Sequence, residues 1–231
     1  MDPSRVARVI ILGPSHHVHI RGCAVSTASS LETPVGDLPI DQDVTRALLA
    51  TGHFEVMTPG MDEDEHSLEM HLPFIRKVME TRTCKVVTIM VGSLSERREE
   101  QYGRLLVPYL DDPSTFFIVS SDFCHWGSRF RYQPCDPTHG AIHEHIRWLD
   151  HQGMALIACQ NVEGFSEYLA EHANTICGRH PIAIFMNTLQ ASSMGFSVTW
   201  VKYAQSNKVV STQDSSVSYA SAVVTQHDSS A

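Results

Sequence analysis

The sequence predicts an α/β fold with a mixed, mainly parallel central sheet that is flanked by helices. Short runs rich in valine, isoleucine and phenylalanine alternate with longer stretches of helical periodicity, an order typical of α/β proteins. The first run, 6–13 (VARVIILG), has a continuous apolar centre, as a strand buried on both faces has. Several polar clusters begin where such a run ends, and ligands of open α/β sheets bind at that edge.

Some segments have the composition of strands, and others have the apolar spacing of helices. The expected strands are 6–13, 21–28, 84–92, 115–121, 196–204 and 217–225. The expected helices are 41–52, 65–82, 95–110, 138–150, 162–172 and 181–190. We expect Asp41 to cap the first helix and Gly52 to end it, and Pro73 to kink or interrupt the second helix.

The length and composition predict one large globular domain. The chain has 231 residues, so we expect a single domain over 1–231, with a flexible tail after about residue 226. Hydrophobic residues make up 42% and charged residues 19%, which excludes disorder over most of the length. The 26 acidic residues outnumber the 17 basic ones, and no basic stripe is present, so nucleic acid is not expected as a partner.

The compartment follows from segments that the sequence does not contain. No apolar stretch approaches the roughly 18–20 residues that span a bilayer, so membrane insertion is not expected. The N-terminal residues lack the basic-then-apolar order of a secretory signal. The 6 cysteines lie far apart with no CxxC pair, which indicates free thiols in a reducing compartment. We expect a cytoplasmic protein, with the nucleus as a second location.

The 14 histidines direct attention to site chemistry, because histidine binds metals and exchanges protons near neutral pH. The first cluster is 13–17 (GPSHH), where we expect Gly13 and Pro14 to turn the chain sharply, which could leave His16 pointing over the sheet edge. The alternative is a turn whose histidines only bond to the backbone. The second cluster is 121–127, where Asp122 and His125 are close enough for the carboxylate to orient the imidazole or for both to face one ion. The alternative there is a pair that satisfies loop backbone.

A third cluster surrounds Cys177, just before a helix whose first turn contains Pro181. The positive helix end, with Arg179 and His180 nearby, would favour a thiolate, which is the form that binds metals. The alternative is a small buried hydrophobe.

A fourth cluster, 62–71, is acidic and begins a helix, which suits the helix dipole. His66 and Glu69 share a helical face there and could reach a site. By contrast, His139, His143 and His145 lie among polar residues and are interpreted as a solvated face. The sequence contains no HExxH, GxSxG, Walker A or strand-linked GxGxxG motif.

In combination, these clusters resemble the Memo family, which is related to the AmmeMemoRadiSam group and, by fold, to the class III (LigB-type) extradiol dioxygenases. The similarity covers nearly the whole chain, and its blocks occur in order. They are LGPSHH (12–17), DEDEHSLEMHLPF (62–74), SSDFCHWG (120–127), TICGRHPI (175–182), YAQS (203–206) and DSSVSYA (214–220).

The resemblance implies a LigB-type, dioxygenase-like fold whose pocket is equivalent to the non-haem iron site. It implies that His16 and Cys177 bind one Fe(II) or copper ion. It assigns Asp122 and His125 as catalytic only if the chain is an enzyme, with His125 where a dioxygenase keeps its acid–base histidine. The residues expected to line the pocket or support its ligands are His17, His66, Glu69, Arg179 and His180.

One departure concerns the third ligand. The family's other metal histidine lies in an N-terminal Pro-His-Ala-Gly motif on an earlier strand, and this sequence contains no such motif. We therefore expect a chain that lacks the family's N-terminal segment and contains two of the three ligands.

The leading functional hypothesis is a Memo-like metal-binding protein that handles iron or copper and acts in signalling and cell motility, or in redox metal handling. A thiolate in place of the dioxygenase carboxylate favours Cu(I), zinc or iron in another role and argues against ordinary ring cleavage. The resemblance implies phosphotyrosine peptides or signalling proteins as partners. The alternatives are a non-haem metal-dependent redox enzyme or oxygenase with the same pocket, and a metal-free peptide-binding scaffold.

Overall fold

The computed structural model describes residues 2–227. Its internal contacts divide the chain into two compact units, Met1–Ser120 and Ser121–Ala231, and each is described by itself. The single domain over 1–231 stays a prediction. The tail that was expected to be flexible lies, from residue 228 onward, outside the described residues.

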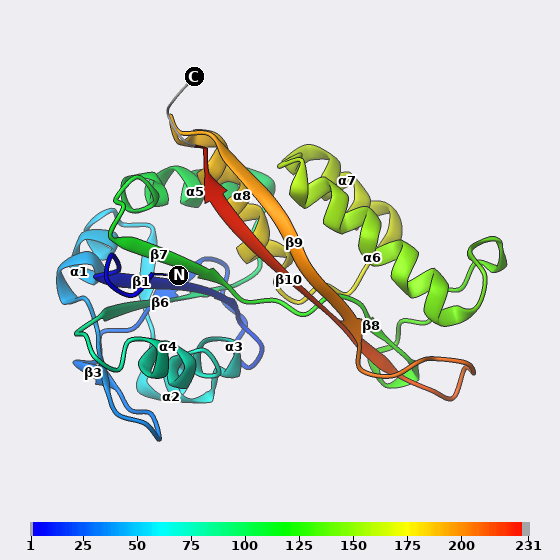
Figure 1. The fold of residues 1–231 in the computed structure, drawn as a ribbon, viewed down its shortest axis with the longest axis horizontal. Coiled ribbons are helices and arrows are strands. Elements are labelled where there is room, and N and C mark those ends of the chain that lie inside the picture. The colour runs from blue at the N-terminus through cyan, green and yellow to red at the C-terminus, as the bar shows by residue number, and fades with distance from the viewer. Residues whose placement is uncertain (1, 228–231) are drawn as a thin grey trace. The chain divides into compact units, whose positions relative to one another are not determined.

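The first unit is built on a five-stranded sheet with the strand order β5-β2-β6-β1-β7 (Figure 1). Strand β1 lies between β6 and β7 and is parallel to both. Strand β2 is parallel to β5 but antiparallel to β6. The strands are β1 (Arg8–Pro14), β2 (Cys23–Val25), β5 (Phe54–Val56), β6 (Lys85–Val91) and β7 (Thr115–Val119). The predicted mixed, mainly parallel sheet is confirmed.

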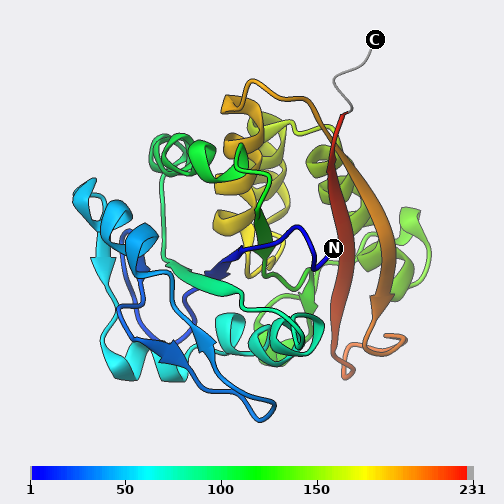
Figure 2. The ribbon, with the colours of Figure 1, turned by 60° about the vertical axis from the view of Figure 1, so that its left-hand side comes forward.

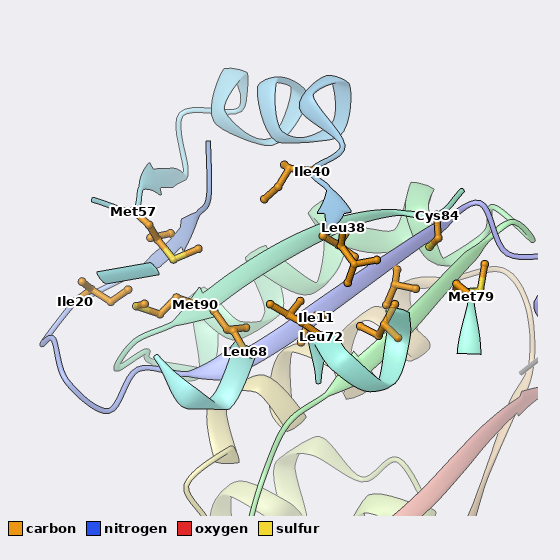
Figure 3. Close-up of a cluster of buried hydrophobic side chains, with 14 residues drawn as sticks. Ile11, Ile20, Leu38, Ile40, Met57, Leu68, Leu72, Met79, Cys84 and Met90 are labelled. Carbon is orange, nitrogen blue, oxygen red and sulfur yellow. The ribbon is translucent and has the colours of Figure 1, made fainter. Parts of the chain in front are cut away.

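Helices cover this sheet, as predicted, and the α3–α4 pair packs on one face of it. Side chains of successive strand residues alternate between the two faces, so Val9 and Ile11 share the face that α3 and α4 cover. Figure 3 shows Leu68 and Leu72 pointing toward Ile11 and Met90 in the buried cluster on this side. Figure 1 shows α5 across the sheet from that pair. The helices of this unit are α1 (Gln42–Ala50), α2 (Pro59–Asp64), α3 (His66–Glu69), α4 (Leu72–Val78) and α5 (Glu96–Leu110).

The predicted cap of α1 is confirmed: the Asp41 carboxylate accepts a hydrogen bond from the Val44 N–H. Gly52 follows the last turn with a φ of +74°, a conformation that glycine adopts without steric cost. The expected helix 65–82 is interrupted as predicted, but the break lies at residues 70–71, ahead of Pro73. Pro73 is in the first turn of α4, where its missing N–H leaves no helical bond unmade.

Shorter elements lie where the sequence pattern was weak. Only Cys23–Val25 of the expected strand 21–28 pairs within the sheet. Two further pairs of residues form a small antiparallel hairpin, β3 (Ser30–Leu31) and β4 (Leu38–Pro39). No strand had been predicted there or at β5, because segments of two or three residues are too short to show a period of 2.

Over its described residues, the second unit combines a three-stranded antiparallel sheet, of order β8-β10-β9, with three α-helices. Strands β9 and β10 run side by side as a long hairpin (Figures 1 and 2). The Trp200 indole of β9 donates a hydrogen bond of 2.9 Å to the Met154 carbonyl of α6. The strands and helices are β8 (His125–Trp126), β9 (Phe196–Gln205), β10 (Ser216–Gln226), α6 (Ile142–Ala158), α7 (Val162–His172) and α8 (Arg179–Ala191).

Two expectations for α6 are corrected. The helix begins at Ile142 and continues to Ala158, while residues 137–139 form a separate 3-10 turn. The solvated face expected for His139, His143 and His145 was wrong for His145, which is 6% exposed. Its ring packs beside Trp148, onto which His139 also stacks with a centroid separation of 3.8 Å. The indole offers these imidazoles an apolar surface that replaces water. Among the described residues, no helix has the length and apolar character needed to cross a membrane.

Substitution of Gly13 tests how closely α3 packs on β1. A Cβ at this position would lie 2.5 Å from Ser67 Oγ and 2.9 Å from Leu68 Cδ2. We expect Gly13→Ala to lower the free energy of unfolding by about 1–3 kcal/mol, because the start of α3 must shift. Chemical denaturation measures the change. Gly60→Ala is the matched control, since nothing lies within 4 Å of a Cβ there. Equal stability of the two variants would contradict this close approach.

Candidate functional site

Gly13 and Pro14, which were expected to turn the chain sharply, instead continue β1 and pair with Met90 and Val91 of β6. The chain bends only after β1, at 16–18, and the Glu65 carboxylate contacts this bend at His16. Glu65 Oε2 accepts the backbone N–H of His16 at 2.7 Å, and Oε1 lies 2.8 Å from His16 Nδ1. Oε1 also accepts the Ser67 N–H at 3.0 Å, so Glu65 caps the start of α3 at the same time. One carboxylate therefore joins the turn after β1 to the helix that packs on it.

The Glu65 side chain is 1% exposed, yet it is ionised. Burial raises its pKa, but the hydrogen bonds from the His16 ring, the His16 N–H and the Ser67 N–H outweigh burial and hold the pKa at about 2. An ionised carboxylate can only accept hydrogen bonds, so the hydrogen between it and His16 belongs to Nδ1. The lone pair of the neutral ring then lies on Nε2.

Two further histidines surround His16. The His66 ring stacks on it with a centroid separation of 4.4 Å, and His17 meets His66 edge-on at 5.9 Å. The ligand atoms of His16, Glu65 and His66 all lie within 4.8 Å of one another, so this group could hold a metal ion. Glu69, expected beside His66, is an exposed residue at the end of α3 and is not a member of the group.

Sequence reasoning missed Glu65. The i, i+3 spacing drew attention to His66 and Glu69, whereas the residue that contacts His16 precedes the helix as its N-cap. The acidic run had been explained by the helix dipole. The available signal was the position of Glu65, because a carboxylate at an N-cap accepts amide hydrogens and is thereby fixed in place.

In the second unit, the blocks 120–127 and 175–182 lie against each other. The Asp122 N–H donates to Cys177 Sγ at 3.1 Å, and the Gly178 N–H donates to Ser121 Oγ at 3.0 Å. The His125 N–H donates to Thr175 Oγ1 at 2.7 Å. Cys177, which is half-buried and forms no disulfide, comes two residues before α8, so its predicted place ahead of a helix is confirmed.

Backbone carbonyls orient the His125 ring. Its Nδ1 lies 2.9 Å from the Phe123 carbonyl and 3.0 Å from the Thr175 carbonyl, so Nδ1 carries the hydrogen. Nε2 lies 3.9 Å from Asp122 Oδ2, beyond hydrogen-bond length. Asp122, considered from sequence as the group that orients His125, is thus beside the opposite nitrogen.

The buried Asp150 of α6 hydrogen-bonds to Cys124 of the first block and to Asn174, which directly precedes the second. It has no exposed surface and accepts hydrogen bonds from the Cys124 N–H, the Asn174 amide and the Tyr203 hydroxyl at 3.2, 3.0 and 2.8 Å. Burial raises the pKa of Asp150, and these hydrogen bonds offset only part of that rise. Sequence reasoning gave Asp150 no role, since a single aspartate inside a helical pattern carries no local signal.

Two further residues expected to line the pocket lie at the start of α8. Arg179 is exposed and His180 is half-buried, both in the first turn of α8. His16, one expected metal ligand, lies in the first unit, and Cys177, the other, lies in the second.

Asp150 predicts a pH dependence of stability. Because burial raises its pKa above the ordinary 3.8, the folded chain holds this proton more tightly than the unfolded chain. The resulting stabilisation is complete below about pH 3.8 and declines as the pH rises through the raised pKa. We expect Asp150→Asn to lack this decline, as measured by urea denaturation between about pH 3.5 and 7. The exposed Glu167→Gln variant is the control. A difference from the unmutated chain that stays constant with pH would contradict the raised pKa.

Comparison with known proteins supplies the family. A family model described as "Memo-like protein" matches residues 1–223. Protein MEMO1 of Rattus norvegicus is 48% identical over 232 residues, which cover 98% of this chain and 78% of that protein. Protein MEMO1 of Homo sapiens is 47% identical with the same coverage. The memo-1 homolog of Caenorhabditis elegans is 46% identical, covering 97% of this chain and 65% of that protein.

A solved structure shares the fold at low sequence identity. The crystal structure of uncharacterized protein JW3007 from Escherichia coli K12 matches with a TM-score of 0.53 at 12% identity, and it covers 93% of this chain and 86% of that one. This likeness concerns the fold alone. The family model and the relatives, which match nearly the whole length at almost half of all positions, show that the chain belongs to the Memo-like family.

Proposed function

We propose that this chain is a metal-binding member of its family that handles iron or copper, with His16 and Cys177 as candidate ligand residues. The observation that carries the proposal is the short contact between His16 Nδ1 and the buried Glu65 carboxylate. Histidines that bind metals usually donate their other ring N–H to a carboxylate or carbonyl, which fixes the tautomer and raises the basicity of the ligating nitrogen.

The chemistry of the second donor also fits such an ion. Cys177 Sγ accepts the Asp122 N–H at 3.1 Å, and hydrogen bonds of this kind stabilise negative charge on sulfur. Thiolates are soft ligands that favour Cu(I), zinc and iron, and imidazole suits zinc, copper and iron. Both kinds of donor therefore favour these transition metals over magnesium or calcium. When bound, such an ion would supply a Lewis acid or a redox centre.

A metal-dependent redox enzyme with a dioxygenase-like pocket is the second candidate. It is favoured by His125, whose Nδ1 is held by two carbonyls, so that its Nε2 is the nitrogen able to accept or donate a proton. Asp122 Oδ2 lies 3.9 Å from this nitrogen.

In the first proposal, by contrast, the chain acts in metal handling or signalling in the cytoplasm. Its proposed partners are phosphotyrosine peptides or signalling proteins. The role, the location and the partners rest on the family resemblance alone.

Anaerobic titration with Fe(II) and with Cu(I) tests the proposal. We expect one ion per chain for the unmutated protein, and loss of stoichiometric binding in both His16→Ala and Cys177→Ser, because each removes a donor atom. Cys135→Ser is the matched control, since Cys135 is an exposed thiol outside the site, and it should bind as the unmutated chain does.

Circular dichroism of each variant separates loss of a ligand from loss of fold. Binding that survives in both folded variants would contradict the assignment of His16 and Cys177. Absence of binding by the unmutated chain would favour a metal-free scaffold. Turnover of a catechol with Fe(II) that is lost in His125→Ala would favour the redox enzyme.

A further inference from the structure

We infer that Glu65 is the positioning residue of His16: its buried carboxylate holds the imidazole in the Nδ1–H tautomer and so directs the Nε2 lone pair toward the ion. This inference rests on the proposed function for its purpose, but its geometric content stands on contacts within the first unit. Glu65 lies within the block 62–74, whose pattern pointed to His66 and Glu69 instead.

The Glu65 carboxylate accepts two hydrogen bonds from His16, one from its backbone and one from its ring. Oε2 accepts the backbone N–H at 2.7 Å and Oε1 accepts the ring N–H at 2.8 Å. If only the ring were hydrogen-bonded, the backbone of His16 could still move and carry the ring with it. Because one carboxylate binds both the ring and the backbone N–H, the orientation of the ring relative to the backbone is fixed. Such control of a ligand's angle is what a precise metal or catalytic geometry requires.

The carboxylate itself cannot move easily. Glu65 is 1% exposed, and Oε1 also accepts the Ser67 N–H at 3.0 Å. The Ser67 hydroxyl donates to the Pro14 carbonyl at 2.8 Å, which ties α3 back to the turn that carries His16. Gly13 allows this approach, since a Cβ there would lie 2.5 Å from the Ser67 oxygen. Glu65 therefore contacts both the segment after β1 and the start of α3, and Ser67 of α3 bonds back to the end of β1. These contacts together fix the position of the carboxylate.

A direct ligand role for Glu65 is the rival interpretation, because His16, Glu65 and His66 form a group of suitable donors. That role would require an ion to displace hydrogen bonds that the carboxylate already accepts from His16 and Ser67. It would also draw in His66, whose Nδ1 is 3.8 Å from Oε1 and whose side chain is 57% exposed. The buried, fully bonded carboxylate fits a group that orients a ligand better than one that binds the ion.

Glu65→Gln is the informative substitution, because it keeps the shape but replaces one acceptor oxygen by an NH₂ donor. Three N–H groups then compete for a single oxygen, and the amide hydrogens face groups that also donate. The His16 ring can relieve this conflict by moving its hydrogen to Nε2, so that Nδ1 becomes an acceptor. Glu63→Gln is the matched control, since it makes the same charge change at an exposed residue of α2.

Long-range ¹H–¹⁵N NMR of the metal-free protein at about pH 8, above the ordinary histidine pKa, identifies which ring nitrogen of His16 carries the hydrogen. We expect the Nδ1–H form in the unmutated chain and in Glu63→Gln, and a shift toward the Nε2–H form in Glu65→Gln. An Nε2–H or doubly protonated ring in the unmutated chain would overturn the inference even if Glu65→Gln fails to fold. An unchanged tautomer in folded Glu65→Gln would overturn it as well.

Metal titration of the same proteins gives the second readout. We expect Glu65→Gln to bind Fe(II) or Cu(I) about 10–100-fold more weakly than Glu63→Gln, the loss typical of residues that orient a ligating histidine. The two proposals fail separately. If the unmutated chain binds no metal while Glu65→Gln shifts the tautomer, the metal proposal fails and the positioning of His16 by Glu65 stands. If metal binds while the tautomer does not respond, the positioning inference is overturned.

Discussion

A carboxylate that leaves water must have its hydrogen-bonding capacity satisfied, and two such groups organise the candidate site regions of this protein. Glu65 is satisfied by the His16 and Ser67 N–H groups, and Asp150 by the Cys124 N–H and two side-chain donors. An unmade hydrogen bond of a buried charge costs more than the bond itself contributes when it forms. Each carboxylate therefore dictates the path of the loops around it, and the candidate site residues lie on those loops.

The two carboxylates meet this constraint with opposite electrostatic results. Glu65 accepts hydrogen bonds from two backbone amides and an imidazole, and its pKa falls to about 2 in spite of burial. Asp150 is fully buried, and the rise in its pKa from burial exceeds what its hydrogen bonds offset. The difference follows from the competition between desolvation and donated hydrogen bonds. It makes Glu65 a fixed negative charge beside His16, whereas Asp150 acts chiefly as a structural anchor for the loops that carry Asp122, His125 and Cys177.

The elements that could be predicted are those whose signal is local and repeated. The apolar runs of β1 and β6, the Asp41 cap and the helix 162–172 were predicted close to their observed bounds, because period and capping act within a few residues. The burial of His145 could not be predicted, since it depends on Trp148 and on a separate turn that carries His139. The break of the expected helix 65–82 at residues 70–71, ahead of Pro73, likewise depends on the packing of Leu68 and Leu72 on the sheet. Pro73 then lies in the first turn of α4.

The sequence by itself determined the α/β class, the family and the positions of the histidines and cysteines that are candidates for the site. These properties reside in residue types and short spacings, which survive without knowledge of the fold. Only the tertiary structure decided which acid serves which histidine. Glu65 rather than Glu69 meets His16, and backbone carbonyls rather than Asp122 orient His125. Partners 49 residues apart, such as His16 and Glu65, are joined by the packing of a helix onto a strand end, and no local pattern encodes that distance.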